Sequence, residues 1–126
     1  MPFDRVVSCE MIEAVGHKHL PEFFEAVEAL LAPHGVFVMQ AITTPESRYP
    51  GIKNSADFIN TIIFPGGCCP SLHALLDAMQ SKSTLHLEGF DNISLHYAET
   101  LRQWRRRFNS QIPRVLELGF DDSFIR

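Results

Sequence analysis

Apolar residues along the chain follow two spacings, one typical of strands and one typical of helices. Residues 3–9 and 36–42 contain short runs of consecutive apolar residues, which predict strands buried on both faces of a parallel sheet. Between them, residues 20–31 carry apolar side chains every three or four positions, which predicts an amphipathic helix. A tight turn at 33–35 separates this helix from the second strand, completing one βαβ unit. We therefore predict parallel, neighbouring strands with the helix packed across them.

The remainder of the chain is predicted to be mostly helical. Ser71 is placed to cap a helix whose apolar stripe is Leu72, Leu75, Leu76 and Met79. Gly119 is suited to end a short helix. The other predicted elements are a helix at 55–64 with Ser55 near its N-cap, a weak strand at 84–89, and helices at 96–110 and 115–118. Strands and helices in this order indicate an α/β fold.

Composition and charge exclude several classes of protein. The 126 residues are 45% hydrophobic and 21% charged, which is ordinary for one globular domain. Fifteen acidic against eleven basic residues give a net charge of -4, which disfavours nucleic-acid binding. No apolar run approaches the roughly 20 residues that a membrane-spanning helix needs. Three cysteines, two of them adjacent, indicate a reduced protein, so we expect a cytoplasmic location.

Common catalytic motifs are missing from the sequence. It contains no glycine-rich nucleotide loop, no Cys-x-x-Cys and no His-Glu-x-x-His. We therefore expect no metal site, and we interpret His17 and His19 as solvated loop residues. Cys68 and Cys69 have no histidine close by in sequence, so we interpret them as small apolar fillers of a bend rather than as nucleophiles.

Polar residues stand at the ends of both predicted strands. Glu10 and Glu13 follow the first strand directly, and Gln40 and Ile42 stand at the end of the second. The carboxyl ends of parallel strands face the cleft in which open α/β sheets bind their ligands. These residues are therefore candidates for a site. Position alone leaves the alternatives open, namely solvated or helix-capping acids and a core-facing Ile42.

A cluster of arginines lies on the helix predicted at 96–110. Its members are Arg102, Arg105, Arg106 and Arg107. One interpretation is a solvated helix face. The other is a basic patch that contacts an anionic headgroup or a membrane surface.

A series of longer motifs runs through the chain in order. Residues 3–17 read FDRVVSCEMIEAVGH, residues 55–59 SADFI, residues 63–68 IFPGGC and residues 96–104 HYAETLRQW. Shorter matching pieces lie at 30–35, 40–43, 48–49, 118–121 and 124–126. The series resembles the catalytic domain of the cyclopropane-fatty-acyl-phospholipid synthase family. The Phe-Pro-Gly-Gly-Cys and Tyr-x-x-Thr-Leu-x-x-Trp pieces together are its most specific parts.

This resemblance implies an S-adenosylmethionine-dependent enzyme with a Rossmann-like class I methyltransferase fold. Members of the family transfer the sulfonium methyl to the cis double bond of a phospholipid acyl chain. The resulting carbocation loses a proton and closes to a cyclopropane, and a bicarbonate ion is the implied base. The chemistry requires a dry apolar tunnel, because water would trap the cation.

The resemblance also implies roles for single residues. Glu13 matches the glutamate of the bicarbonate site, and Tyr97 matches a tyrosine whose hydroxyl can donate to the anion. Ile42 matches a residue whose backbone lines the same site. Gln40 stands where many members have histidine, and its amide cannot become cationic. Ala14 also replaces a histidine of other members.

The matched segments contain only part of the region that binds the cofactor in this family. Ser8 and Cys9 match the strand-end position that contacts S-adenosylmethionine, whereas the glycine-rich loop of this fold would precede residue 3. The resemblance thus implies an internal part of the catalytic domain, without the first three strands and the last strand. We expect these 126 residues alone to be inactive and not to bind S-adenosylmethionine saturably.

The partners implied by the resemblance are phospholipid acyl chains, with peripheral membrane contact through the arginine cluster and no nucleic acid. The oligomeric state is left open. Two alternative functions also remain at this point. One is methyl transfer to a small amine by a related methyltransferase, and the other is a non-catalytic remnant that binds lipid or a protein partner.

Overall fold

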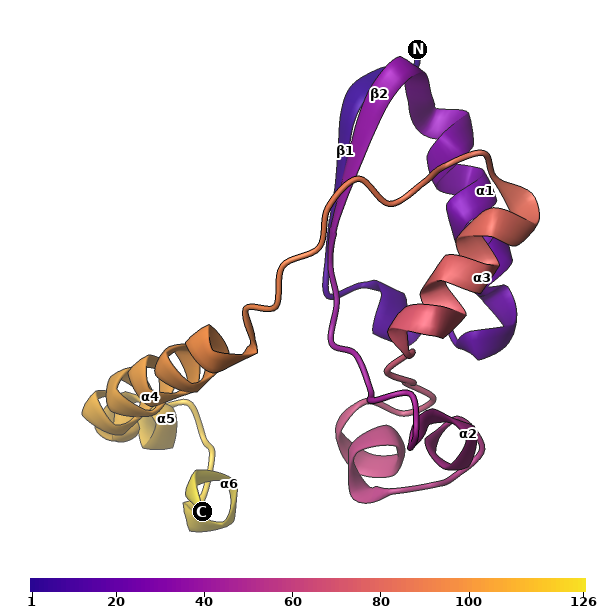
Figure 1. Cartoon of the computed structure of the whole chain (residues 1–126). Coiled ribbons are helices and arrows are strands. Elements are labelled where there is room, and N and C mark those ends of the chain that lie inside the picture. Colours follow the sequence, from indigo (N-terminus) through magenta and orange to yellow (C-terminus); the bar gives the residue numbers. More distant parts are fainter. The chain divides into compact units, whose positions relative to one another are not determined.

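The computed structural model describes residues 1–126, which form two compact units, residues 1–88 and 89–126. The first unit contains the β-strands, and the second is helical (Figure 1). The helices and strands of the first unit are β1 (Phe3–Cys9), α1 (Leu20–Leu30), β2 (Leu31–Gln40), α2 (Tyr49–Ile52) and α3 (Leu72–Lys82). It also has two 3-10 turns, η1 (Ile12–Ala14) and η2 (His17–His19), and a short π-helix, η3 (Ile59–Ile63). The second unit consists of α4 (Ser94–Ser110), α5 (Ile112–Glu117) and α6 (Asp122–Ile125).

The predicted βαβ unit is confirmed. β1 and β2 pair in parallel, with Arg5 opposite Val36 and Cys9 opposite Gln40. The register shifts between Phe3 and Arg5, so that β2 begins several residues earlier than predicted. Glycine is required at position 35 within this irregular stretch, because a Cβ there would lie 2.9 Å from a backbone carbonyl oxygen.

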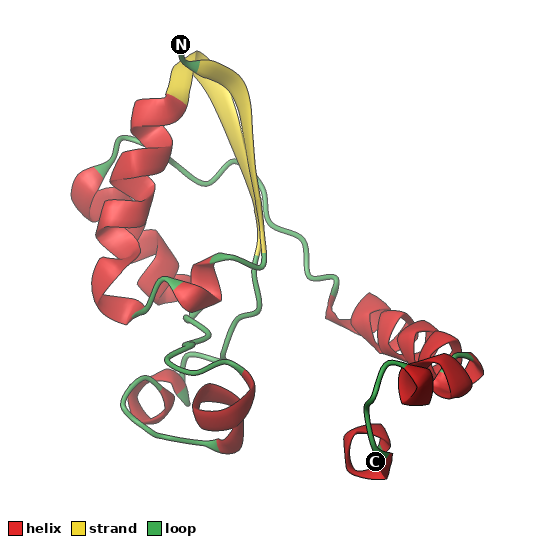
Figure 2. Ribbon diagram, turned by 180° about the vertical axis from the view of Figure 1, so that it is seen from behind, coloured by secondary structure: helices red, strands yellow, loops and turns green.

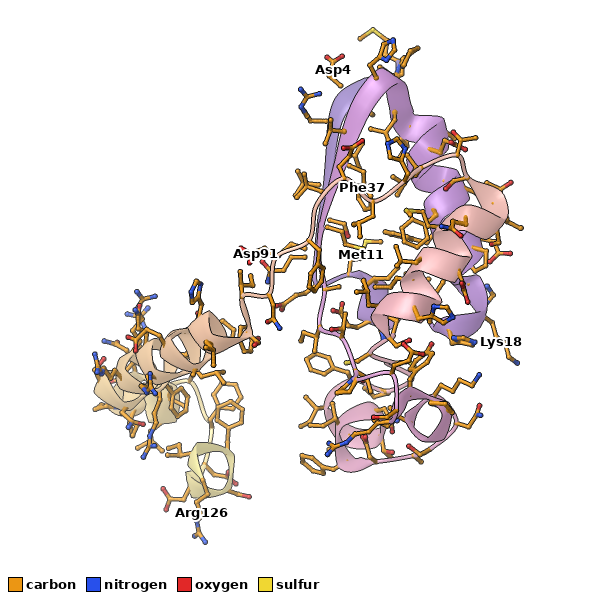
Figure 3. The ribbon with its side chains drawn as sticks, in the orientation of Figure 1. Asp4, Met11, Lys18, Phe37, Asp91 and Arg126 are labelled. Carbon is orange, nitrogen blue, oxygen red and sulfur yellow. The ribbon has the colours of Figure 1, made fainter.

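The core lies between the sheet and the two longer helices of the first unit. α1 and α3 lie on the same side of the strands (Figure 2). The buried apolar residues of this core are Ile12, Leu20, Phe24, Leu75, Ala78 and Met79. Phe37 projects from β2 toward the helices (Figure 3), and its ring centroid lies 6.0 Å from that of Phe23. The Ser71 cap is also confirmed, since its hydroxyl accepts a hydrogen bond from the Ala74 N–H at 3.1 Å.

The other face of the sheet is open in the first unit. Val7, Val36 and Val38 keep 73%, 45% and 54% of their surface exposed. The prediction that the strands are buried on both faces is therefore wrong for this chain. The physical reason is that the helices that cover the sheet in this unit, α1 and α3, lie on its other face.

Two further predictions differ from the structure. Residues 84–89 form no strand, because a strand needs a neighbour for its backbone groups and β1 and β2 pair only with each other. Thr84 is instead held by Glu28, whose Oε1 accepts its N–H at 2.7 Å. The helix predicted at 55–64 is reduced to η3, and the Ser55 hydroxyl donates to the Ile52 carbonyl rather than capping it.

The second unit contains both predicted helices, each starting earlier than predicted, and a further short helix, α6, that was not predicted. α4 begins at Ser94, two residues before the predicted start, and the Tyr97 and Trp104 rings lie edge to face at 6.4 Å. The helix at 112–117 ends as expected, with Gly119 in the left-handed region at φ 92°. No helix in the structure is both long and apolar enough to cross a bilayer.

The open sheet face generates a testable prediction. The 126-residue chain should self-associate, because exposed valines and a free strand edge invite pairing between chains. Size-exclusion chromatography with light scattering should show species larger than a monomer. The V7T/V38T variant keeps the β-propensity but removes apolar surface, so it should shift the distribution toward monomer. A monomeric wild-type chain with a cooperative melting transition would contradict this expectation.

Candidate active site at the strand ends

Glu13 is held by hydrogen bonds from two other parts of the chain. It lies in η1, directly after β1, and η1 is anchored by the fully buried Ile12. The backbone N–H of Ile42, just past the end of β2, donates to Glu13 Oε1 at 2.5 Å. The backbone N–H of Cys68 donates to the Glu13 carbonyl oxygen at 2.8 Å. The carboxylate is thereby fixed between the end of β2 and the Phe-Pro-Gly-Gly-Cys turn.

The second oxygen of this carboxylate has no partner in the protein. Glu13 Oε2 is buried and accepts no hydrogen bond, and the hydroxyl of Ser8 on β1 is in the same condition. Buried polar atoms are nearly always hydrogen-bonded, because leaving one unpaired costs about 1–3 kcal/mol. These two atoms therefore have spare hydrogen-bonding capacity that a ligand can use.

Gln40 pairs with a different acid from the one that Ile42 contacts. Its Nε2 donates to Glu10 Oε1 at 2.9 Å, and the Glu10 N–H donates to the Gln40 carbonyl oxygen at 2.9 Å. Glu10 adopts a left-handed backbone conformation with φ 47°, which is uncommon for a residue other than glycine. One N–H of the Gln40 amide is thus engaged, and its second N–H is left for another acceptor.

The remaining candidates have different environments. Ile42 is exposed, so the core-facing alternative is wrong, and its N–H is already used by Glu13. Cys9 is exposed at the end of β1, whereas Ser8 points to the covered side. Tyr97 belongs to α4 in the second unit, so its proximity to Glu13 stays a prediction. In the arginine cluster, Arg102 is paired with Glu99 at 3.2 Å.

Sequence reasoning missed a polar pair beside this site. Tyr49 is buried, and its hydroxyl is hydrogen-bonded to Nδ1 of His17. Burial, together with the nearby Cys68 thiol, raises the pKa of Tyr49 to about 12. The two residues are 32 positions apart, with α1 and β2 between them, so no periodicity could have joined them. Tyr49 stood out only as part of a motif of the resemblance.

The two adjacent cysteines lie close to Glu13 and remain thiols. Burial is the main cause that raises the pKa of Cys69, and the carboxylate of Glu13 adds to it. Burial likewise raises the pKa of Cys68. A raised pKa lowers the thiolate fraction, which agrees with the interpretation of these residues as fillers of the bend. No three His, Cys, Asp or Glu side chains gather closely enough to hold a metal ion.

A parallel βαβ unit with polar groups gathered at the strand ends is the architecture of an open α/β enzyme. The family model described as mycolic acid cyclopropane synthetase matches residues 1–126, and the chain belongs to this family. Tuberculostearic acid methyltransferase UfaA1 of Mycobacterium tuberculosis is 42% identical over 124 residues, 98% of this chain and 29% of that protein. Cyclopropane-fatty-acyl-phospholipid synthase of Escherichia coli is 33% identical over 98% of this chain and 31% of that protein.

The fold agrees with this assignment. The crystal structure of mycolic acid cyclopropane synthase CmaA1, complexed with SAH and CTAB, superposes with a TM-score of 0.81 at 25% identity. The superposition covers 98% of this chain and 46% of that one. The α/β class and a partial Rossmann-like methyltransferase fold are thereby confirmed. The chain spans less than a third of the two sequence relatives and less than half of this structure.

The Tyr49–His17 pair yields a prediction about stability. Tyr49→Phe should lower the free energy of unfolding by about 1 kcal/mol, because it removes one partly buried hydrogen bond. Chemical denaturation at neutral pH measures this difference. The matched control is Tyr97→Phe, since the hydroxyl of Tyr97 has no hydrogen-bond partner among the side chains of the structure.

The pH dependence of this effect has a definite sign. The pKa of Tyr49 is about 12 in the folded protein and about 10 in an unfolded chain, so folding favours the protonated phenol. The stabilisation is complete below pH 10 and is lost as the pH rises from 10 through 12. Wild-type protein should therefore lose stability over this range more steeply than the Tyr49→Phe variant. Parallel losses in the two proteins would show that Tyr49 has an ordinary pKa.

Proposed function

We propose that the protein is an S-adenosylmethionine-dependent methyltransferase that acts on an acyl chain of a phospholipid and converts its cis double bond into a cyclopropane. The family assignment supports this activity, and both sequence relatives named above are described as enzymes of fatty-acid modification. The bound SAH of the CmaA1 structure supports the choice of cofactor. A small-amine substrate has no comparable support among these relatives.

The observation that carries the proposal is the state of the Glu13 carboxylate. One oxygen is fixed by the Ile42 N–H, which orients the group, and the other is buried without a donor. A carboxylate in this state can accept a hydrogen bond from the hydroxyl of a bicarbonate ion, which fits the ion expected at this site. Bicarbonate, when bound, supplies the base that removes a proton from the methylated acyl chain.

The other residues of the site take supporting roles in this proposal. Gln40 can donate its second amide N–H to the anion while Glu10 holds the first. Tyr97 supplies a hydroxyl donor from α4, as the resemblance implies. Ile42 contributes through Glu13, because its N–H is not free for the anion itself.

The cofactor is assigned to the end of β1. S-adenosylmethionine, when bound, supplies the methyl group. The buried Ser8 hydroxyl has no partner in the protein, so it is the group on β1 that can bind part of the cofactor. Cys9 lies next to it at the exposed end of the strand.

The product can differ from a cyclopropane without any change in the first step. One relative is named as a methyltransferase, so retention of the transferred methyl group is the second candidate outcome: the cation loses a proton from a chain carbon instead, which leaves a methyl-branched alkene. Gas chromatography with mass spectrometry of the fatty acids distinguishes these products. Phospholipid with oleoyl chains and methyl-labelled S-adenosylmethionine are the substrates for this assay.

Glu13→Gln tests the site directly. In a full-length enzyme that contains this segment, turnover should fall by roughly a hundredfold or more, because Glu13 positions the base and a positioned base contributes about 10²–10⁴-fold. The Michaelis constant should change far less, since the base is needed only after methyl transfer has begun. Glu88→Gln is the matched control, because Glu88 is exposed and pairs only with His86. Unchanged turnover in Glu13→Gln would refute the proposed role.

We also propose that the arginine cluster makes peripheral contact with the membrane. Arg102, Arg105 and Arg106 follow a spacing that places them on one side of α4. Leu101 and Trp104, on a neighbouring face, are 49% and 56% exposed. A basic helix with exposed apolar side chains suits the surface of an anionic bilayer.

The membrane contact is tested by vesicle sedimentation. In R105Q/R106Q, binding to vesicles with phosphatidylserine should fall by at least about tenfold, since each basic residue near an anionic surface contributes about 1 kcal/mol. Neutral phosphatidylcholine vesicles and the variant Arg114→Gln are the controls. Equal binding of R105Q/R106Q and Arg114→Gln would assign the cluster to a solvated face.

A further inference from the structure

A hollow lined by several polar residues lies beside the strand ends, within the first unit. It has a volume of about 670 Å³ and is lined by residues 16–19, 52–56, 60–61 and 66–68. The first of these segments precedes α1, and Lys18 extends outward from it (Figure 3). None of the residues proposed for the methyl-transfer site lines the hollow.

The charge of the hollow is opposite to that of the chain. Its lining contains Lys18, Lys53, His17 and His19 and no aspartate or glutamate, although the chain has fifteen acids against eleven Lys and Arg. Neither lysine is engaged in an ion pair, since the ion pairs of the structure involve only Lys82, Arg102 and two other histidines. Two lysines without carboxylate partners thus line one open space.

The walls of the hollow also supply neutral donors and a restrained geometry. Asn54 lines the hollow, and its side-chain amide is not used by another side chain of the protein. The Lys53 ammonium lies 6.0 Å from the centre of the Tyr49 ring, which limits its range. Tyr49 keeps its proton at neutral pH and can donate it to Nδ1 of His17, which leaves the proton of the imidazole on Nε2 as a donor.

We propose that this hollow binds the phosphate group of a phosphate ester. Two unpaired ammonium groups with amide and imidazole donors match an oxyanion with several acceptor oxygens. The open side leaves room for the rest of the ester. In the sequence, exposed apolar residues lie between the segments that line the hollow. They are Phe58, Ile59, Ile62, Ile63 and Phe64. These residues suit the apolar part of a phospholipid. The choice of a phospholipid rests on the proposed function, but the proposal that the hollow binds phosphate does not rest on it.

The test measures binding without methyl transfer. Isothermal titration calorimetry compares glycerol 3-phosphate, a soluble ester, with dihexanoylphosphatidylglycerol below its micelle concentration, a lipid diester. The K18Q/K53Q variant should weaken binding by about tenfold, because it removes two charge-assisted contacts at an exposed site. The control R5Q/R114Q makes the same change of charge at two exposed arginines outside the hollow and should bind as wild type.

A second variant protects the test against misfolding. Asn54→Asp keeps both lysines and adds one negative charge to the lining, so it should also weaken binding. Weakening confined to the lipid identifies a headgroup site, and weakening of glycerol 3-phosphate binding as well identifies a general phosphate site. Binding of both ligands that is unchanged in both variants would overturn the proposal. That result would leave the methyl-transfer proposal untouched, since S-adenosylmethionine is absent from the experiment.

Discussion

The hydrogen bonds of Glu13 connect three segments on which the arrangement of the first unit depends. Its carboxylate accepts the Ile42 N–H, and its backbone carbonyl accepts the Cys68 N–H. The end of β2 and the Phe-Pro-Gly-Gly-Cys turn are therefore both hydrogen-bonded to η1. The buried Ile12 anchors η1 in the core. Gly67 allows the turn itself to be tight, because a Cβ there would lie 3.0 Å from the Phe64 carbonyl oxygen. The same bonds that build the strand ends leave one carboxylate oxygen buried and free.

Local patterns were sufficient to predict β1, α1 and their parallel partner, because a βαβ unit is encoded by consecutive stretches of sequence. The Ser71 cap and the stop at Gly119 were predictable for the same reason, since each depends on a few adjacent residues. The structure of residues 84–89 was not predictable in this way. Alternating apolar and polar residues show that a segment can form a strand, but they do not show whether a neighbouring strand exists to pair with it. The exposed valines of the sheet have the same cause. Their apolar character anticipates a covering layer that the first unit does not contain.

The candidate site was predictable only as a set of positions. Strand-end placement identified Glu10, Glu13, Gln40 and Ile42, yet which of them pair was set by the register of β1 against β2. Because Cys9 pairs with Gln40, the Gln40 side chain reaches the carboxylate of Glu10. The carboxylate of Glu13 instead accepts the N–H of Ile42. The Tyr49–His17 pair depends on the course of the irregular segment 41–48 that follows β2, which no short-range pattern encodes.

The distribution of charge around the Phe-Pro-Gly-Gly-Cys turn suggests how the two proposed sites work together. Cys68 donates its N–H to Glu13 and also lines the hollow, so this turn borders both places. On one side are the carboxylates of Glu10 and Glu13, whose negative charge suits a sulfonium cation. On the other are Lys18 and Lys53, which attract phosphate and repel the sulfonium. Under the two proposals, a phospholipid entering this field would be oriented by charge, with its phosphate held at the lysines. Its uncharged acyl chain would then be the part free to approach the strand ends, as the proposed methyl transfer to a double bond requires.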